Sequence, residues 1–215
     1  MKCGKIEMLN MDCMEYMRTV PDKYFDLAIV DPPYGINASK GTWGGSNRGQ
    51  VTNYGKKDWD NFAPDETYFN ELMRASKNQI IWGANHFISK IPLDSSCWIV
   101  WDKKNGDSDF ADCELAWGSF KSAVRKFEWR WNGFLKQKPE ERFHPTQKPI
   151  ALYQWLLQNY AKPGDKILDT HGGSMSSAIA AHYGGFDMVI CELDKEYFEA
   201  AKIRFDKATA QEALF

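Results

Sequence analysis

Apolar, strand-like runs alternate with helical segments in both terminal parts of this 215-residue chain, and this alternation is the strongest constraint on its fold. An apolar run, an amphipathic helix and a second apolar run form the pattern of a β-α-β unit, which places parallel strands in one sheet. Strands are predicted at residues 5–12, 24–31, 78–85, 165–170 and 187–194, and helices at residues 13–20, 64–77, 147–164, 177–184 and 195–214.

The middle of the chain follows a different pattern. Three β-like runs, at residues 97–104, 113–120 and 124–131, have no helices of similar length between them. Consecutive strands joined by short connections pair antiparallel, so this region is predicted to be antiparallel. The sequence therefore predicts an α/β fold with a doubly wound, mostly parallel sheet and an antiparallel part. The length fits one domain, residues 1–215, with no internal repeat.

Several classes of protein are disfavoured by the sequence. No apolar run approaches the roughly 18–20 residues of a membrane helix, and the N-terminus has no signal-peptide pattern, so we expect a cytoplasmic protein with no membrane partner. The cysteines are odd in number and show no zinc-binding spacing, and they are interpreted as reduced core thiols without a metal or disulfide role.

Two segments are basic although the formal net charge is −2. Residues 36–57 contain no acid and are rich in Gly, Ser and Asn, whereas residues 121–148 carry eight Lys or Arg against three acids and are interleaved with aromatic residues. Such segments suit an anionic polymer with stackable bases, although solvated faces and core aromatics are the alternative. We expect a flexible basic insertion at about residues 36–60 and candidate nucleic-acid contacts at Lys40, Arg48, Lys56, Lys57, Arg125 and Arg130.

Four acids, Asp12, Asp31, Asp169 and Glu192, fall at the carboxyl ends of predicted parallel strands, where such sheets bind ligands. After Asp169, the loop "HGGSMS" at residues 171–176 allows close backbone approach and opens a helix. Glu192 follows at the end of the next strand, where a carboxylate can accept hydrogen bonds from both hydroxyls of a ribose. This pattern fits a nucleoside-bearing cofactor, with a plain turn as the alternative.

The stretch "DPPYG" at residues 31–35 is the second candidate site. Two prolines remove amide donors, so Asp31 and the Pro32 carbonyl can only accept hydrogen bonds, while Tyr34 offers a flat face for a base. The exocyclic amine of a nucleobase is a poor nucleophile, and two acceptors that favour its developing positive charge would stabilise the transition state of its attack on an electrophile. The alternative is a Pro-Pro turn with a packed tyrosine.

Four motifs together resemble the S-adenosylmethionine-dependent amino-methyltransferases of DNA: "DPPYG", "HPTQKPIALYQWLL" at 144–157, "DTHGGS" at 169–174 and "ICELDKEYFEAAKIR" at 190–204. The resemblance implies a Rossmann-like methyltransferase fold, double-stranded DNA as partner, a place in restriction-modification, and transfer of a methyl group to N6 of adenine, because the DPPY form mostly accompanies adenine. The motif order implies a circular permutation, in which the N-terminal run at residues 5–12 supplies the strand beside the ribose-acid strand.

The resemblance also implies roles for individual residues. The catalytic positions would be Asp31, Pro32, Pro33 and Tyr34. The cofactor would be bound by Asp12, Asp169, His171, Gly172, Gly173, Ser174, Glu192, Thr146 and Lys148. The cofactor loop departs from the family pattern at Thr170, His171 and Met175, since His171 stands where a phenylalanine is usual and Met175 where a glycine is usual.

Three alternatives stay open: methylation of the cytosine N4 amine, methylation of an RNA base, and an inactive methyltransferase-like subunit that binds nucleic acid. The target-recognition region, within about residues 121–148, is very short, since only "NGFLKQKPEERF" separates Trp131 from His144. Recognition is therefore expected to be short, relaxed, supplied by the insertion, or supplied by a homodimer or a separate specificity partner.

Overall fold

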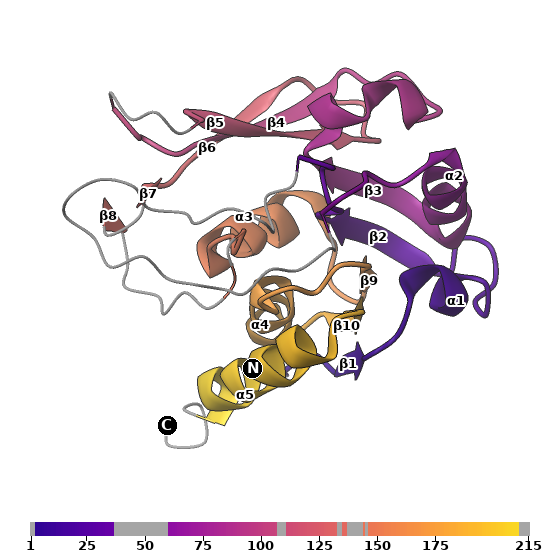
Figure 1. The fold of residues 1–215 in the computed structure, drawn as a ribbon, viewed down its shortest axis with the longest axis vertical. Coiled ribbons are helices and arrows are strands. Elements are labelled where there is room, and N and C mark those ends of the chain that lie inside the picture. The colour runs from indigo at the N-terminus through magenta and orange to yellow at the C-terminus, as the bar shows by residue number, and fades with distance from the viewer. Residues whose placement is uncertain are drawn as a thin grey trace.

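A computed structural model describes residues 3–36, 60–106, 111–132, 135–136, 144 and 146–210. Figure 1 shows the arrangement of its helices and strands. The strands are β1 (Ile6–Leu9), β2 (Phe25–Val30), β3 (Ser76–Trp82), β4 (Cys97–Asp102), β5 (Cys113–Gly118), β6 (Arg125–Glu128), β7 (Trp131–Asn132), β8 (Leu135–Lys136), β9 (Lys166–Asp169) and β10 (Asp187–Cys191). The helices are α1 (Cys13–Met17), α2 (Glu66–Ala75), α3 (Ile150–Tyr160), α4 (Ser176–Gly184) and α5 (Lys195–Ala210), with short 3-10 turns at Ala84–His86 and Ile88–Lys90.

The described strands form a large mixed sheet with the order β1-β10-β9-β2-β3-β5-β4-β6, while β7 and β8 form a separate antiparallel pair. The first five strands of this order are mutually parallel, and β5 runs antiparallel to both of its neighbours. The predicted α/β fold with a mostly parallel sheet and an antiparallel part is confirmed. The N-terminal strand β1 pairs with β10, as the expected strand arrangement requires; circular permutation relative to relatives stays a prediction.

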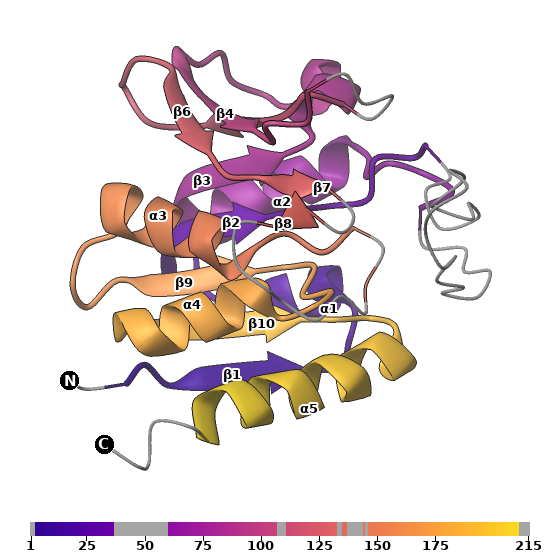
Figure 2. The ribbon, with the colours of Figure 1, turned by 90° about the vertical axis from the view of Figure 1, so that its left-hand side faces the viewer.

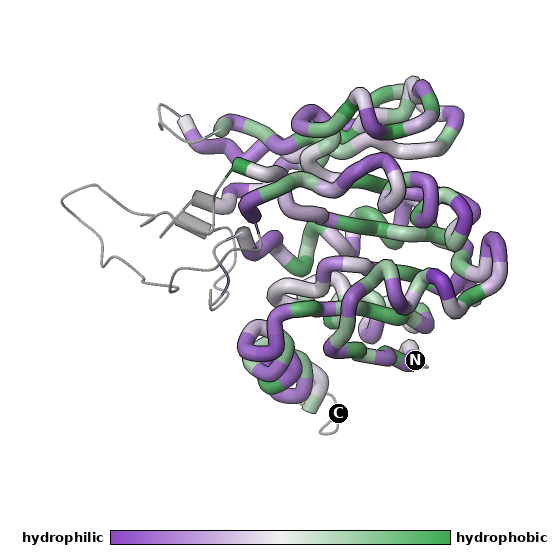
Figure 3. The backbone as a smooth tube through the Cα atoms, turned by 45° about the vertical axis from the view of Figure 1, so that its right-hand side comes forward, coloured by the Kyte–Doolittle hydropathy of each residue, from purple (hydrophilic) through white to green (hydrophobic). Residues whose placement is uncertain are grey.

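Helices cover both faces of the parallel strands. Helices α3, α4 and α5 lie on one face, and α1 and α2 lie on the other, as Figures 1 and 2 show from perpendicular directions. Hydrophobic residues are concentrated in the interior strands (Figure 3). Strand β2, for example, is buried at five of its six positions because helices pack on both of its faces. One hydrophobic cluster fills each layer between the sheet and its helices.

Helix α2 illustrates how local sequence sets these elements. It begins after Asp65, whose carboxylate accepts hydrogen bonds from the backbone N–H groups of Thr67 and Tyr68 at 3.0 and 3.3 Å. The helix buries Tyr68, Phe69, Leu72 and Ala75, a spacing that places all four side chains on one face. The amphipathic pattern in the sequence thus fixes both the start of α2 and the face that packs on the sheet.

Strand β6 corrects one prediction, because it runs parallel to β4 and not antiparallel. The chain does reverse direction between β4 and β5 and again between β5 and β6. However, β4 lies between β5 and β6 in the sheet, so β6 neighbours a strand of its own direction. The order of strands in a sheet is a tertiary property that connection lengths alone do not fix.

The basic aromatic segment is also corrected in part. Phe127 and Trp131 are buried in the main hydrophobic cluster, and Trp129 packs against it while stacking on Phe127 at 6.0 Å between ring centroids. Phe127 and Trp131 are therefore core aromatics, the alternative considered for this segment, whereas Trp129 is only partly buried. The predicted nucleic-acid contacts Arg125 and Arg130 are exposed.

Two further expectations concern the cysteines and the insertion. Cys97 and Cys191 are buried and Cys13 is half-buried, but Cys3 and Cys113 are exposed, so the interpretation as core thiols fails for those two. The nucleic-acid contacts predicted within the insertion lie outside the described residues, and they are Lys40, Arg48, Lys56 and Lys57. Across the described parts of the chain, no helix has the length and apolar character needed to cross a membrane.

Candidate active site

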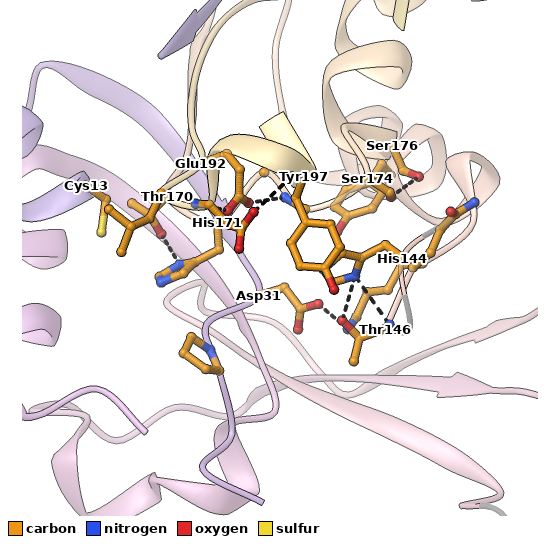
Figure 4. A pocket seen from close by; sticks show the side chains of 18 of the residues that line it. Cys13, Asp31, His144, Thr146, Thr170, His171, Ser174, Ser176, Glu192 and Tyr197 are labelled. Carbon is orange, nitrogen blue, oxygen red and sulfur yellow. Dashed lines mark hydrogen bonds and ion pairs between the residues drawn. The ribbon is translucent and has the colours of Figure 1, made fainter. Parts of the chain in front are cut away.

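A cavity of about 370 Å³ opens at the carboxyl ends of β1, β2, β9 and β10. Parallel strands bring their carboxyl ends to one edge of the sheet, which is why residues distant in sequence meet there. The lining residues are Met11, Asp12, Cys13, Asp31, Pro33, His144, Thr146, Gln147, Lys148, Tyr153, Thr170, His171, Gly172, Gly173, Ser174, Ser176, Glu192, Leu193, Asp194 and Tyr197. Figure 4 shows Asp31, Glu192 and Tyr197 around this space.

Glu192 is joined to the glycine loop by a hydrogen bond. Its Oε2 accepts from the N–H of Gly173 at 2.7 Å, and its Oε1 accepts from the N–H of Asp194 at 2.8 Å. Gly173 has a φ of +48°, a backbone conformation that disfavours residues with a side chain. Burial raises the pKa of the Glu192 carboxyl, although these N–H groups oppose the shift. The loop and Glu192 thus form one preorganised wall.

Asp169 lies behind this wall and not among the cavity-lining residues. Its side chain is buried, with Oδ2 accepting from the Ser177 hydroxyl at 2.6 Å and Oδ1 accepting from the N–H of His171 at 3.0 Å. Burial raises the pKa of the Asp169 carboxyl to about 7 despite these two donors. Through these two hydrogen bonds Asp169 stabilises the turn that follows β9. Its predicted direct contact with the cofactor stays a prediction.

His171 and Met175, the departures from the family loop, differ in where their side chains lie. His171 lines the cavity, its Nδ1 is 2.9 Å from the Thr170 hydroxyl, and burial lowers its pKa to about 4, so the ring is neutral at pH 7. Met175 is fully buried in the main hydrophobic cluster. Its side chain therefore leaves the cavity open, and only its backbone, at φ +56°, adopts the conformation that glycine favours.

Asp31 and Tyr34 form a pair at the end of β2. The Tyr34 hydroxyl donates to Asp31 Oδ1 at 2.8 Å, and the Tyr34 ring stacks on His86 with centroids 4.8 Å apart. On Gly83, which has a φ of +68°, a Cβ atom would fall 2.0 Å from Tyr34 Cε1. Gly83 therefore gives the Tyr34 ring the room it needs beside Asp31.

Lys148 reaches Asp31 from the other side. Its Nζ lies 2.6 Å from Asp31 Oδ2 and 3.0 Å from Glu114 Oε2, and its side chain is only 3% exposed. Lys103 extends the cluster, with its Nζ 2.5 Å from Glu114 Oε1. The structure thus places the Lys148 ammonium on Asp31, whereas its predicted contact with the cofactor stays a prediction.

Three other predicted cofactor residues line the cavity and also make contacts within the protein. Asp12 lines the cavity, but its Oδ1 also caps α1 by accepting from the N–H of Met14 at 2.6 Å. Thr146 lines the cavity, and its hydroxyl is 3.2 Å from His144 Nδ1. The Ser174 carbonyl accepts from Arg204 Nη1 at 2.6 Å, which ties the loop to α5.

Sequence reasoning missed several residues of the site. Glu114 and Lys103 belong to the Asp31 cluster, and Tyr197 lines the cavity with its ring against His144, 4.5 Å between centroids. Nothing in the sequence marks Glu114 as part of a charge cluster with Lys148. Tyr197 lies at the start of α5, shortly after β10 and Glu192. This closeness to Glu192 in sequence is the one signal that could have placed it at the site.

The structure brings the Glu192 carboxylate, the glycine loop and the Asp31 carboxylate into one cavity. Residues 98–203 match the N6_N4_Mtase family model, described as DNA methylase. The chain resembles the S-adenosylmethionine-dependent DNA amino-methyltransferases, as its motifs predict. A curated relative, the Type II methyltransferase M2.DpnII of Streptococcus pneumoniae, is 25% identical over 94% of this chain and 90% of its own length. Another, M.HinfI of Haemophilus influenzae, is 25% identical over 92% of this chain and 67% of its own length.

Solved structures of similar chains show the shared fold. The M1.HpyAVI–SAM complex superposes with a TM-score of 0.60 at 22% identity, covering 93% of this methyltransferase and 99% of that chain. The cytosine-N4-specific PvuII DNA methyltransferase gives a TM-score of 0.61 at 13% identity, covering 97% and 92%.

The residues of the cavity fit S-adenosylmethionine, the cofactor of this methyltransferase. The cavity volume lies in the usual range for small-molecule sites, and Gly172 and Gly173 leave two adjacent positions of the loop without side chains. Glu192 faces this space with a carboxylate suited to ribose hydroxyls. Among the described residues, no group of three or more His, Cys, Asp or Glu side chains is arranged to bind a metal ion.

Proposed function

We propose that this methyltransferase transfers the methyl group of S-adenosylmethionine to N6 of adenine in double-stranded DNA. One observation carries the proposal: Asp31, the first residue of the DPPY motif, lines the same cavity as the glycine loop and Glu192. A carboxylate at that position suits a target amine beside the cofactor. The Asp31 form of the motif, as distinct from a serine at its first position, favours adenine over cytosine.

The proposed chemistry requires little more than positioning. S-adenosylmethionine supplies an electrophilic methyl group, and Glu192 with the loop 172–174 would hold the cofactor. Asp31 and the Pro32 carbonyl would accept hydrogen bonds from the target amine, which favours the charge that develops on its nitrogen. Holding two reactants in one cavity provides much of the rate. No covalent nucleophile is required.

The target adenine must leave the duplex to reach Asp31, at a cost of a few kcal/mol. Tyr34 lies next to Asp31, and His86 already covers one face of its ring with centroids 4.8 Å apart, so a base would not stack on that face. We propose that Arg125 and Arg130, both exposed, contact DNA phosphates. We further propose that the remaining recognition comes from the segment at 36–60, from a second copy of the chain, or from a separate specificity subunit.

The test is to incubate the protein with labelled S-adenosylmethionine and mixed-sequence duplex DNA, and then to identify the methylated nucleoside by mass spectrometry. N6-methyladenine is the expected product, and Asp31→Ala should abolish it while leaving the cofactor dissociation constant within about twofold. N4-methylcytosine would instead assign the alternative base. Cofactor binding without labelled DNA would direct the search to RNA or a partner, and loss of cofactor binding as well would identify an inactive subunit.

A further inference from the structure

The Asp31 carboxylate belongs to a largely buried cluster of alternating charges. Lys148 lies between Asp31 and Glu114, with its Nζ 2.6 and 3.0 Å from their carboxylate oxygens, and Lys103 contacts the far oxygen of Glu114 at 2.5 Å. The exposed fractions of the four side chains are 3% for Lys148, 16% for Asp31, 17% for Lys103 and 22% for Glu114. Two acids and two ammonium groups leave this cluster neutral overall.

The balance of charge depends most on Lys148. Burial raises the pKa of the Asp31 carboxyl, Glu114 adds to that shift, and the Lys148 ammonium opposes both. Burial alone would also raise the pKa of Glu114, but Lys148 and Lys103 outweigh it and hold the pKa at about 2. Without Lys148, two carboxylates would face each other in a buried site, a situation that drives one of them to bind a proton.

A protonated Asp31 would serve the proposed reaction poorly. A neutral carboxyl group presents a hydroxyl donor to the target amine and lacks the negative charge that stabilises a developing ammonium. In the observed arrangement, Oδ1 accepts from the Tyr34 hydroxyl and Oδ2 from Lys148, and each oxygen keeps a second acceptor position for an incoming amine. Lys148 thus orients the Asp31 carboxylate and still leaves acceptor positions on its oxygens for the target amine.

We propose that Lys148, anchored by Glu114, is a positioning residue that keeps the Asp31 carboxylate charged and oriented toward the target amine. This inference deepens the proposed function and rests on it for its catalytic consequence. The charge state of Asp31 itself is a property of the protein without DNA or cofactor. It is therefore measurable even if the proposed reaction proves wrong.

Asp31 has several titratable neighbours besides Lys148. They come from its own loop, from β5, α3 and α2, and from the end of β9. These neighbours are Tyr34, Glu114, Tyr153, Tyr68 and Asp169. The three tyrosines have pKa values well above 10 and are neutral at pH 7, so Lys148 is the cation that decides the Asp31 charge.

The primary measurement is the titration of the Asp31 side-chain carboxyl by ¹³C NMR in protein labelled at aspartate carboxyl carbons, with Asp31→Asn to assign the signal. We expect Lys148→Met to raise the titration midpoint by about 1–3 pH units, the range for loss of an adjacent opposite charge. Lys148→Arg should keep the midpoint near that of the wild type. Lys103→Met, which removes a cation that contacts Glu114 but not Asp31, should shift it less than Lys148→Met.

A second variant protects the test against misfolding. Lys148→Met combined with Glu114→Gln removes one charge of each sign, so the fold is not left with an extra buried carboxylate, and its Asp31 midpoint should lie below that of Lys148→Met alone. In single-turnover methylation, the acid limb of the pH profile should move upward by the same amount as the NMR midpoint. An Asp31 midpoint that is unchanged in folded Lys148→Met would overturn the inference. Duplex DNA that the wild-type protein leaves unmethylated, while the Asp31 midpoint shifts in Lys148→Met, would refute the proposed reaction and leave the inference about Lys148 standing.

Discussion

The substitution Gly83→Ala tests whether backbone space at one glycine positions Tyr34. Gly83 has a φ of +68°, and an added Cβ would lie 2.0 Å from Tyr34 Cε1. Gly106 provides a matched control because its φ is +63° and a Cβ there would have no heavy atom within 4 Å. Both substitutions impose the same left-handed strain, about 1–2 kcal/mol, but only Gly83→Ala adds a clash.

The size of the additional effect follows from the geometry. Ordinary contacts to a Cβ begin at 3.4 Å, so the Tyr34 ring must retreat by about 1.4 Å, the difference between 3.4 and 2.0 Å. Such a movement breaks the 2.8 Å hydrogen bond from the Tyr34 hydroxyl to Asp31. Overpacking costs about 1–3 kcal/mol, and a lost hydrogen bond to a charged group costs about 1.5–3 kcal/mol. We expect Gly83→Ala to destabilise the fold by about 2.5–6 kcal/mol more than Gly106→Ala.

The assay is urea denaturation of both variants and the wild type, followed by single-turnover methylation and cofactor titration under native conditions. Gly83→Ala should slow methyl transfer while the cofactor dissociation constant stays close to that of the wild type, because the displaced ring adjoins Asp31 and not the glycine loop. If the two variants agree within about 0.5 kcal/mol in the free energy of unfolding and transfer methyl groups equally fast, the assigned role of Gly83 is refuted.

Three further predictions concern the glycine loop, Glu192 and the residues that hold them. Glu192→Ala removes the acceptor for two backbone N–H groups and for a ribose, and it should raise the cofactor dissociation constant about 10–150-fold, the equivalent of about 1.5–3 kcal/mol; a change below twofold by isothermal titration calorimetry would contradict this role. The pKa of Asp169 is raised from 3.8 to about 7, so the free energy of unfolding should fall as the pH rises from about 4 to 7, by at most about 4 kcal/mol for 3.2 pH units. Asp169→Asn should flatten that slope, and denaturation at pH 5 and pH 8 will show whether it does. The pKa of His171 is lowered from 6.5 to about 4, so stability should fall as the pH drops through this interval, and His171→Phe should reduce the loss measured between pH 7 and pH 5.

The pattern of the sequence was enough to predict the parallel sheet and the edge that carries the site. Alternating apolar runs and amphipathic helices are local signals, and strands that must be parallel bring their carboxyl ends together whatever their side chains are. This is why Asp12, Asp31 and Glu192 were predicted at one site and all line one cavity. The residues 172–174 were predicted beside them for the same reason.

Only the tertiary structure decided what each of these groups contacts. Asp169 ends a strand as Glu192 does, yet it is buried behind the loop, while Glu192 reaches the cavity. Lys148 lies 117 residues from Asp31 in the chain and reaches it through a contact that no local pattern encodes. Strand β6 joins its neighbour in parallel because strand order is set by packing. Periodicity and spacing determine which elements form and which edge they share, whereas burial and charge pairing between distant segments determine the chemistry of each side chain.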